Sequence, residues 1–480
     1  FSKPVEEQPP FWQEGIVLVL GRVALSLLLL VIPCLAVCSF VVRKGYRDSI
    51  LLGLVALAVI GLDGYLSFWL WFISPLVGET SNILLPALAV LYFFFSFRSL
   101  DRQARTVLKS LWIPFGVTTA AALLVLSMGF LHGGLDRPIE TAKTRFSHRL
   151  PNDNLIPFVF AESLGKRHIQ KPMVDGWSSS DRPPLQTGIY LSQFIHADDE
   201  LGYMVTSVIS QCLWVFALQL FLEALKLDRR AVALVLVICL LTGFVFLNSF
   251  YTWPKMLAAA YTLGLITLFF ADSFRLMLRI EKLFAVLAGA LFALAMLSHG
   301  GSIFALLGLA SMLVLTRKPV TLKALGTMFV SAALLYLPWT LYQKLYDPSG
   351  DRLLKWHLAG VEEPGTPPLG QVLAQAYGRL TFRQWVANKK TNLLTIVGPE
   401  ASYWQNTLAL LSSPIRRDSD RALEVASQLR GEAFFFLIPT LGFLIFGLVA
   451  LVIGIYKPAR GPEWRTAGSL CVFVSLACVL

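Results

Sequence analysis

Long apolar runs separated by short polar loops dominate this sequence. The runs approach or exceed the length of about 18 residues that a helix needs to cross a hydrocarbon core, and they lack the strict alternation of barrel strands. The pattern therefore predicts an all-α, polytopic membrane protein with a helical bundle of about 12 spans. The expected spans cover roughly 15–42, 50–73, 83–97, 110–131, 202–225, 231–250, 256–274, 283–297, 302–315, 324–342 and 433–455, and a twelfth from about 466 that the end of the sequence cuts.

The distribution of cations over the loops predicts the orientation of these spans. Six alternate short loops carry nineteen lysines and arginines, whereas the three intervening short turns carry only Lys255. Short loops rich in lysine and arginine stay in the cytoplasm. The N-terminus and the two long polar segments are therefore expected on the opposite face.

Those two polar segments divide the chain into four parts. Residues 1–109 are expected to form an N-terminal extension of three spans, and residues 110–342 a transmembrane core with the first outer loop at 133–199. Residues 343–432 form a second outer segment, interpreted as a cap over the first loop. Residues 433–480 hold the truncated C-terminal spans. Both outer segments are expected to contain helices that lie in the membrane interface.

The composition excludes several other classes of protein. With 56% hydrophobic and 15% charged residues, the chain is not a soluble globular protein. The net charge of +11 resides mostly in short loops beside spans, where the cations orient the helices, so it does not predict a nucleic-acid partner. Attraction to the anionic head groups of membrane lipids is the second interpretation. All six cysteines lie in expected spans, so neither a disulfide framework nor a metal site is predicted.

Candidate chemistry is concentrated in the first outer loop. Asp153 stands just before an apolar helix expected from Leu155, and from the pattern alone it is interpreted first as an N-cap and second as a functional carboxylate. Arg182 precedes Pro183 and Pro184, which predict a rigid turn into a helix at 185–194. Its guanidinium could bind a phosphate, pair with the neighbouring Asp181, or meet a lipid head group.

Two short outer turns carry further candidates. Lys255 is either a cation that snorkels beside the aromatic Trp253 or a functional group. His299 is either a hydrogen-bonded turn residue or a donor to an anionic head group. The acidic cluster at 198–200 is expected to complement the positive end of the following helix.

Taken together, these motifs resemble the GT-C superfamily of integral-membrane glycosyltransferases, which use polyprenyl-phosphate-linked sugars. The similarity covers about 111–339, and the superfamily includes protein O-mannosyltransferases and the aminoarabinose transferase of lipid A. The matching residues are Asp153, Ala161-Glu162-Ser163-Leu164 and Arg182-Pro183-Pro184-Leu185, with softer matches at Trp253-Pro254-Lys255, Ser298-His299-Gly300-Gly301 and Tyr336-Leu337-Pro338-Trp339.

The resemblance implies an inverting sugar transfer from a polyprenyl-phosphate donor to a hydroxyl of a glycan, lipid or protein acceptor. Asp153 would act as the general base. A leaving phosphate needs cations rather than a general acid. The implied site residues are Arg182, Lys255 and His299 for the donor phosphate, and Glu162, Asp181 and Tyr190 for other substrate contacts.

The resemblance also has implications for cofactors and location, and it leaves the class of acceptor open. No cofactor is expected to be required, and the location would be a bacterial inner membrane with the site on the periplasmic face. Asn154 and Lys255 stand where many relatives carry a second acid, which leaves the acceptor class open. The alternative function is a transporter or flippase of lipid-linked saccharides. It is disfavoured because the spans carry few charges, mainly Arg22 and Asp63.

Overall fold

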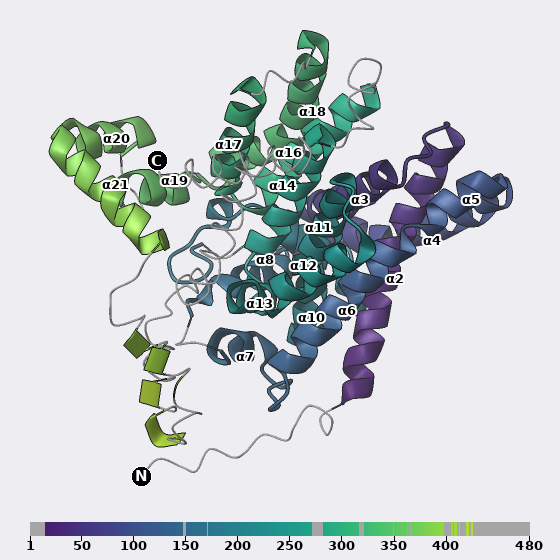
Figure 1. Ribbon diagram of the computed structural model, residues 1–480, viewed down its shortest axis with the longest axis horizontal. Helices are drawn as coiled ribbons and strands as arrows, with labels where there is room; N and C mark the ends of the chain where they lie inside the picture. The colour runs from purple at the N-terminus through teal and green to yellow at the C-terminus, as the bar shows by residue number, and fades with distance from the viewer. Residues whose placement is uncertain are drawn as a thin grey trace.

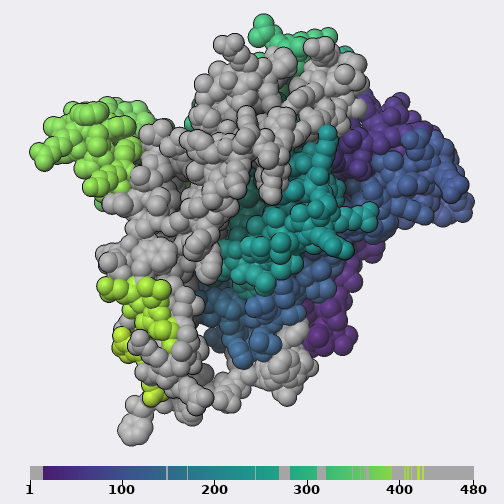
Figure 2. All heavy atoms as spheres, viewed as in Figure 1, coloured from purple at the N-terminus to yellow at the C-terminus, as the bar shows by residue number. Residues whose placement is uncertain are grey.

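In the residues that it describes, the computed structural model consists of helices joined by turns and loops, with no β-strand. These residues are 15–146, 150–169, 171–270, 282–315, 321–348, 350–361, 363 and 367–397, with short pieces between 405 and 425. Figure 1 shows the helices gathered into one bundle, with α20 and α21 at its edge. In Figure 2 these two helices, in light green, protrude from the surface.

Six helices in the described part of the chain are long and apolar enough to cross a membrane. This finding confirms the class of protein expected from the hydropathy pattern. Two of the six contain a short break, at Ser110–Leu111 and at Cys212. The six are α2 (Ile16–Arg43), α3 (Ser49–Ile73), α4 (Pro75–Arg98), α5 with α6 (Arg102–Lys109 and Trp112–Gly129), α10 with α11 (Glu200–Gln211 and Leu213–Ala224), and α18 (Leu322–Leu341) with the π-helical turn η4 (Tyr342–Tyr346).

The expected count of about 12 spans does not fit this structure. Between residues 229 and 315 the apolar runs form helices of 8 to 17 residues: α12 (Arg229–Leu241), α13 (Gly243–Phe250), α14 (Lys255–Phe270), α16 (Lys282–Ser298) and α17 (Ser302–Leu315). At 1.5 Å per residue, the longest of them reaches only about 26 Å. The sixth expected span is broken at Thr242, and the eleventh and twelfth lie outside the described residues.

The expected turn at 74–82 is also corrected. Ser74 is extended and ends α3, and Pro75 then occupies the first turn of α4. Proline is well suited to that position because its missing N–H would have no helical partner there. The helix therefore begins about eight residues earlier than the hydropathy pattern indicated.

The first outer loop folds back into the bundle. Its helices are α7 (Pro138–Thr144), α8 (Ile156–Gly165) and α9 (Leu185–Leu191), with 3₁₀ turns η1 (Asn152–Asn154), η2 (Ser179–Asp181) and η3 (Phe194–His196). All seven residues of α9 are buried, and the helix packs against α3.

A pair of glycines makes this close packing of α9 feasible. A Cβ atom added to Gly188 would lie 2.1 Å from the carbonyl oxygen of Gly64 in α3. Trp71 Nε1 and Asn82 Nδ2 both donate to the carbonyl of Leu191, at 3.1 and 2.8 Å. The expectation that the helix at 185–194 lies in the membrane interface is therefore wrong, because protein surrounds it. Most of α8 is buried as well.

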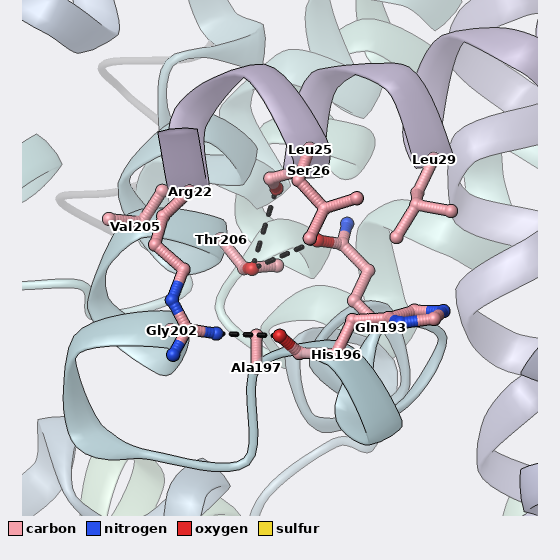
Figure 3. A pocket seen from close by; sticks show the side chains of 10 residues that line it. All are labelled: Arg22, Leu25, Ser26, Leu29, Gln193, His196, Ala197, Gly202, Val205 and Thr206. Carbon is pink, nitrogen blue, oxygen red and sulfur yellow. Dashed lines mark hydrogen bonds between the residues drawn. The ribbon is translucent and has the colours of Figure 1, made fainter. Parts of the chain in front are cut away.

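The N-terminal helix α2 is joined to the end of the same loop (Figure 3). Arg22 donates to the His196 carbonyl at 2.6 Å, as Figure 3 shows. It also pairs with Asp199 at 2.6 Å. Asp199 also caps α10 by accepting from the backbone N–H of Gly202 at 2.6 Å. The expected complement to the positive helix end is thus confirmed, and the charge of Arg22 inside a span has a partner.

The second outer segment contacts the first through its beginning. After η4 come α19 (Arg352–Ala359), α20 (Leu369–Gly378) and α21 (Phe382–Val397). Gln343 Nε2 donates to the Ser180 carbonyl at 2.9 Å, and Lys171 of the first loop pairs with Asp347 at 3.4 Å. The described contacts between the two segments therefore lie near residues 343–356.

Candidate functional site

Asp153 and Arg182 form a buried ion pair at the centre of the candidate site. Arg182 Nη2 donates to Asp153 Oδ1, and their side chains are only 9% and 10% exposed, Arg182 first. Asp153 lies inside the 3₁₀ turn η1, and α8 begins later, with Leu155 at its N-cap and no side-chain cap. The interpretation of Asp153 as a helix cap is therefore wrong, and Arg182 pairs with Asp153 rather than with Asp181.

The guanidinium of Arg182 has donors left over. Its Nε and Nη1 atoms are buried and have no hydrogen-bond partner within the part of the chain that the structure describes. Its carbon Cζ lies 4.4 Å from the ring centroid of Trp177. Burial lowers the pKa of Arg182, and the nearby charges of Asp153 and Asp181 act in the opposite direction. Because an arginine stays charged in proteins, this site holds a cation with unsatisfied donors.

Lys255 lies beside the same group. Its Nζ is 3.6 Å from the ring centroid of Trp253, and Arg182 Cζ is 5.9 Å from that centroid on the same indole. Burial lowers the pKa of Lys255 to about 8, while Asp153 raises it and Arg182 lowers it further. The shared Trp253 ring places the Lys255 ammonium group close to the Asp153–Arg182 pair.

His299 approaches from the other short turn. Its ring centroid is 6.3 Å from that of Trp253. Its Nδ1 accepts from the backbone N–H of Gly301 at 3.0 Å, so the proton of a neutral imidazole resides on Nε2. The structure thus gathers Arg182, Lys255 and His299 around one indole, although 117 residues separate the first from the last in the sequence.

Hydrogen bonds from the bundle fix the segment that carries Asp153. Tyr251 donates to the carbonyl of Pro151, and Tyr203 donates to the carbonyl of Asn154 at 2.6 Å. Burial raises the pKa of Tyr251, and the negative charge of Asp153 raises it further. The hydroxyl therefore remains a donor at physiological pH. The backbone is therefore fixed by hydrogen bonds both before and after Asp153, in addition to the ion pair that its side chain makes with Arg182.

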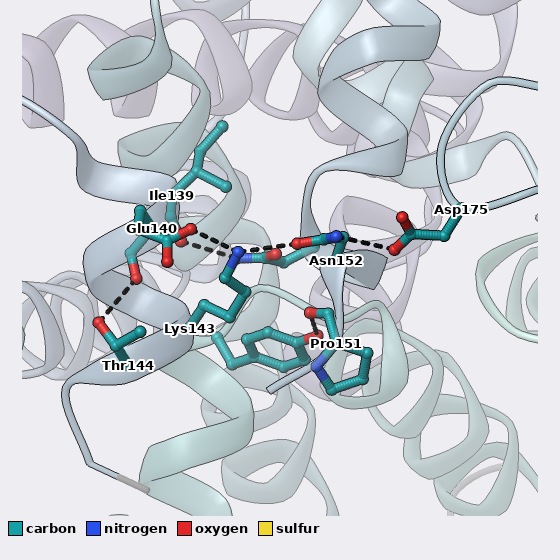
Figure 4. Close-up of polar contacts among 9 residues, drawn as sticks. Ile139, Glu140, Lys143, Thr144, Pro151, Asn152 and Asp175 are labelled. Atoms are coloured by element: carbon teal, nitrogen blue, oxygen red, sulfur yellow. Dashed lines mark hydrogen bonds and ion pairs between the residues drawn. The ribbon is translucent and has the colours of Figure 1, made fainter. Parts of the chain in front are cut away.

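A network of polar side chains, which the sequence did not suggest, connects α7 with the segment that carries Asp153 (Figure 4). Lys143, 6% exposed at its side chain, pairs with Glu140 and donates to Asn152 Oδ1 at 2.7 Å. Asn152 in turn donates to Asp175 Oδ2 at 2.7 Å. The asparagine before Asp153 is thus oriented by a buried cation on one side and a carboxylate on the other.

The three residues predicted to make other substrate contacts have local partners. Asp181 accepts from the backbone N–H of Ser178 at 2.9 Å, and burial raises its pKa. Glu162 pairs with Lys166, one helical turn away, at 3.5 Å. Tyr190 is fully buried, and its hydroxyl is 3.4 Å from the Asp199 carbonyl. Glu162 and Tyr190 make these contacts away from the Asp153–Arg182 pair.

Trp177 joins the two outer segments. Its ring lies 4.4 Å from Arg182 Cζ and 4.0 Å from Arg352 Cζ, and Arg352 also donates to the Gly176 carbonyl at 2.7 Å. Cation–π contacts of this kind stabilise a cation that is removed from water. The sequence offered one signal, a tryptophan in a polar loop, but nothing that connected it with Arg352.

Within the described residues no group of three or more histidine, cysteine, aspartate or glutamate side chains could hold a metal ion. The fold and the site together define a helical membrane protein with a buried acid–arginine pair beneath two outer segments. Comparisons of the chain with protein families, curated proteins and solved structures find no match.

Proposed function

We propose that this protein is an inverting glycosyltransferase that moves a sugar from a polyprenyl-phosphate donor to an acceptor hydroxyl. The observation that supports it most is the state of Arg182, a buried guanidinium that bonds to Asp153 through Nη2, while its Nε and Nη1 have no hydrogen-bond partner among the residues that the structure describes. Buried donors left unpaired are unfavourable, by roughly 1–3 kcal/mol for each group. A phosphate oxygen is the acceptor that suits them best, because phosphate is anionic and accepts several hydrogen bonds.

The neighbours of Arg182 favour the same ligand. Lys255 adds a second cation on the Trp253 ring, and His299, whose ring lies 6.3 Å from that of Trp253, adds an Nε2–H donor in the same region. Developing negative charge on a leaving phosphate is stabilised by such preorganised donors. The two indoles, Trp177 and Trp253, exclude water from the cations and strengthen these interactions.

The ion pair also suggests how Asp153 would become a base. Arg182 holds the carboxylate in the absence of substrate, and the donor phosphate would compete for the same guanidinium. Asp153 would then accept the proton of the acceptor hydroxyl. As the proton is removed, the oxygen of that hydroxyl attacks the anomeric carbon of the sugar. The bond from that carbon to the phosphate oxygen breaks, and the polyprenyl phosphate leaves with the electron pair. No general acid is needed, because a phosphate with a second pKa near about 6 is a good leaving group.

The proposed setting follows the distribution of loop cations. The site lies in the segment placed opposite the basic loops, which corresponds to the periplasmic face of a bacterial inner membrane. The acceptor would be a glycan, lipid or protein that reaches this face.

The experiment compares membranes that carry the wild-type chain, Asp153→Asn or Asp198→Asn. Asp198 is an exposed acid in the same loop and serves as the matched control. The readout is the release of polyprenyl phosphate from polyprenyl-phosphate sugars, which does not require the acceptor to be known. We expect Asp153→Asn to lose at least about 100-fold in rate, as for removal of a general base, and Asp198→Asn to retain it. Full activity in Asp153→Asn would exclude the base. Movement of labelled donor across vesicles without release of phosphate would favour a flippase.

A further inference from the structure

A cavity lies at the end of α3 opposite to the end that contacts the first outer loop. It has a volume of about 620 Å³, within the range of small-molecule sites. It lies between α6, α11 and α12 and is lined mainly by aliphatic side chains, with Gln219, Glu223 and Arg229 at its polar end. Ser49, the first residue of α3, also lines it, whereas the last turns of α3 contact the first outer loop. Ser49 and Trp71 are 22 residues apart on α3, which corresponds to about 33 Å along the helix.

The polar end of this cavity has an unsatisfied acceptor. Gln219 is 3% exposed, and its Nε2 donates to Glu223 Oε1 at 2.9 Å. That bond fixes the orientation of the amide, because a carboxylate cannot donate in return. Gln219 Oε1 is then buried without a hydrogen-bond partner among the described residues. An N–H or O–H group of a ligand would satisfy it, and Glu223 favours a donor with positive charge.

The apolar part of the cavity is continuous with surface that faces lipid in a membrane protein. Ile113 and Val237, which both line it, are 53% and 51% exposed. Only Val232 and Leu236 of α12 are buried, so this helix is attached to its neighbours by a narrow contact. An acyl chain can therefore enter from the bilayer and fill the space between α12 and α6.

We propose that this cavity binds an ethanolamine phospholipid of the surrounding bilayer. The ammonium group donates to Gln219 Oε1 and Glu223, the phosphate faces Arg229, and one acyl chain occupies the aliphatic part. Charge complementarity selects this head group over its alternatives. Choline has the same charge but no N–H donors, and a glycerol head group leaves the lipid anionic beside Glu223. The site is separate from the proposed sugar transfer and does not depend on it.

The test is native mass spectrometry of the full chain in detergent with three phospholipids of identical acyl chains. Their head groups are ethanolamine, choline and glycerol. We expect the ethanolamine lipid to be retained roughly tenfold more than the choline lipid, the effect of a charge-assisted hydrogen bond. Equal retention of the two would overturn the proposal.

Variants identify the place of binding. Glu223→Gln changes an exposed side chain, so the protein should still fold, and we expect it to bring retention of the ethanolamine lipid down to that of the choline lipid. Arg229→Gln should weaken binding of all three phospholipids, because each carries a phosphate. Arg230→Gln, one residue further along and outside the cavity, is the matched control and should change nothing. Unchanged head-group selectivity in Glu223→Gln would show that the lipid binds elsewhere and would refute the assignment.

Discussion

Removing one member of the buried ion pair should cost far more stability than removing both. Arg182→Met leaves the Asp153 carboxylate, 10% exposed, without its cation, and Asp153→Ala leaves a guanidinium that cannot lose its charge. Breaking a buried pair from one side typically costs about 3–5 kcal/mol, whereas replacing both partners by apolar groups is close to neutral. We therefore expect each single variant to lower the free energy of unfolding by about 3 kcal/mol. The double variant removes both charges and should lie closer to the wild type than either single variant does, which requires a coupling energy above about 3 kcal/mol.

Denaturant titration of the four proteins in one detergent measures this cycle. The wild type, the two single variants and the double variant should unfold with the same dependence on denaturant, so that their midpoints report stability alone. Additive effects, with a double variant as unstable as both singles combined, would refute a direct pair. Such a result would mean that Asp153 and Arg182 each interact mainly with other groups.

Three further predictions concern other parts of the molecule. The KM for the donor should rise as the pH passes about 8, because Lys255 is charged below its lowered pKa and neutral above it. A steady-state pH profile measures this dependence, and Lys255→Arg should remove it. Gly188→Ala should lower the free energy of unfolding by about 1–3 kcal/mol through overlap of the new Cβ with α3, whereas Gly116→Ala, with open space around it, should be neutral or slightly stabilising in the same titration. Arg22→Met should cost less than about 1 kcal/mol by that measurement, because its partner Asp199 is 50% exposed; a loss as large as that of Arg182→Met would contradict the difference in burial.

The sequence predicted the class of fold well because apolar run length is a local property. The helices α2 and α3 begin and end within one or two residues of the expected spans. The predicted number of spans was wrong because tertiary packing decides where some apolar runs are broken into shorter helices. Thr242 interrupts an apolar run between α12 and α13, and Gly243 is a weak local signal there because glycine is also frequent inside transmembrane helices. Likewise, α9 reads as an interfacial helix, and only the approach of Gly188 to Gly64 shows why it is buried.

The sequence allowed several residues of the candidate site to be identified, but it did not allow the contacts between them to be predicted. Asp153 and Arg182 stood out because they are charged residues next to prolines and apolar helices, yet the pattern favoured a cap for the first. Their pairing depends on how η1 and η2 approach each other in space. Lys143 and Arg352 were missed for the same reason. A buried lysine and an arginine stacked on Trp177 have no local signature, because each is defined by a partner far away in the chain.

The hydrogen bonds of α9 impose an order on the assembly of this protein. Gln186 Nε2 donates to the carbonyl of Thr252 at 2.7 Å, and Tyr251 holds the Pro151 carbonyl beside Asp153. A growing chain emerges from its N-terminus, so Asp153 and Arg182 are made long before these two partners exist. A nascent chain that ends before Tyr251 contains both charged residues but lacks the groups that hold them in place. Asp153 and Arg182 are synthesised early, but the site that contains them can form only after Tyr251 and Thr252 have been synthesised.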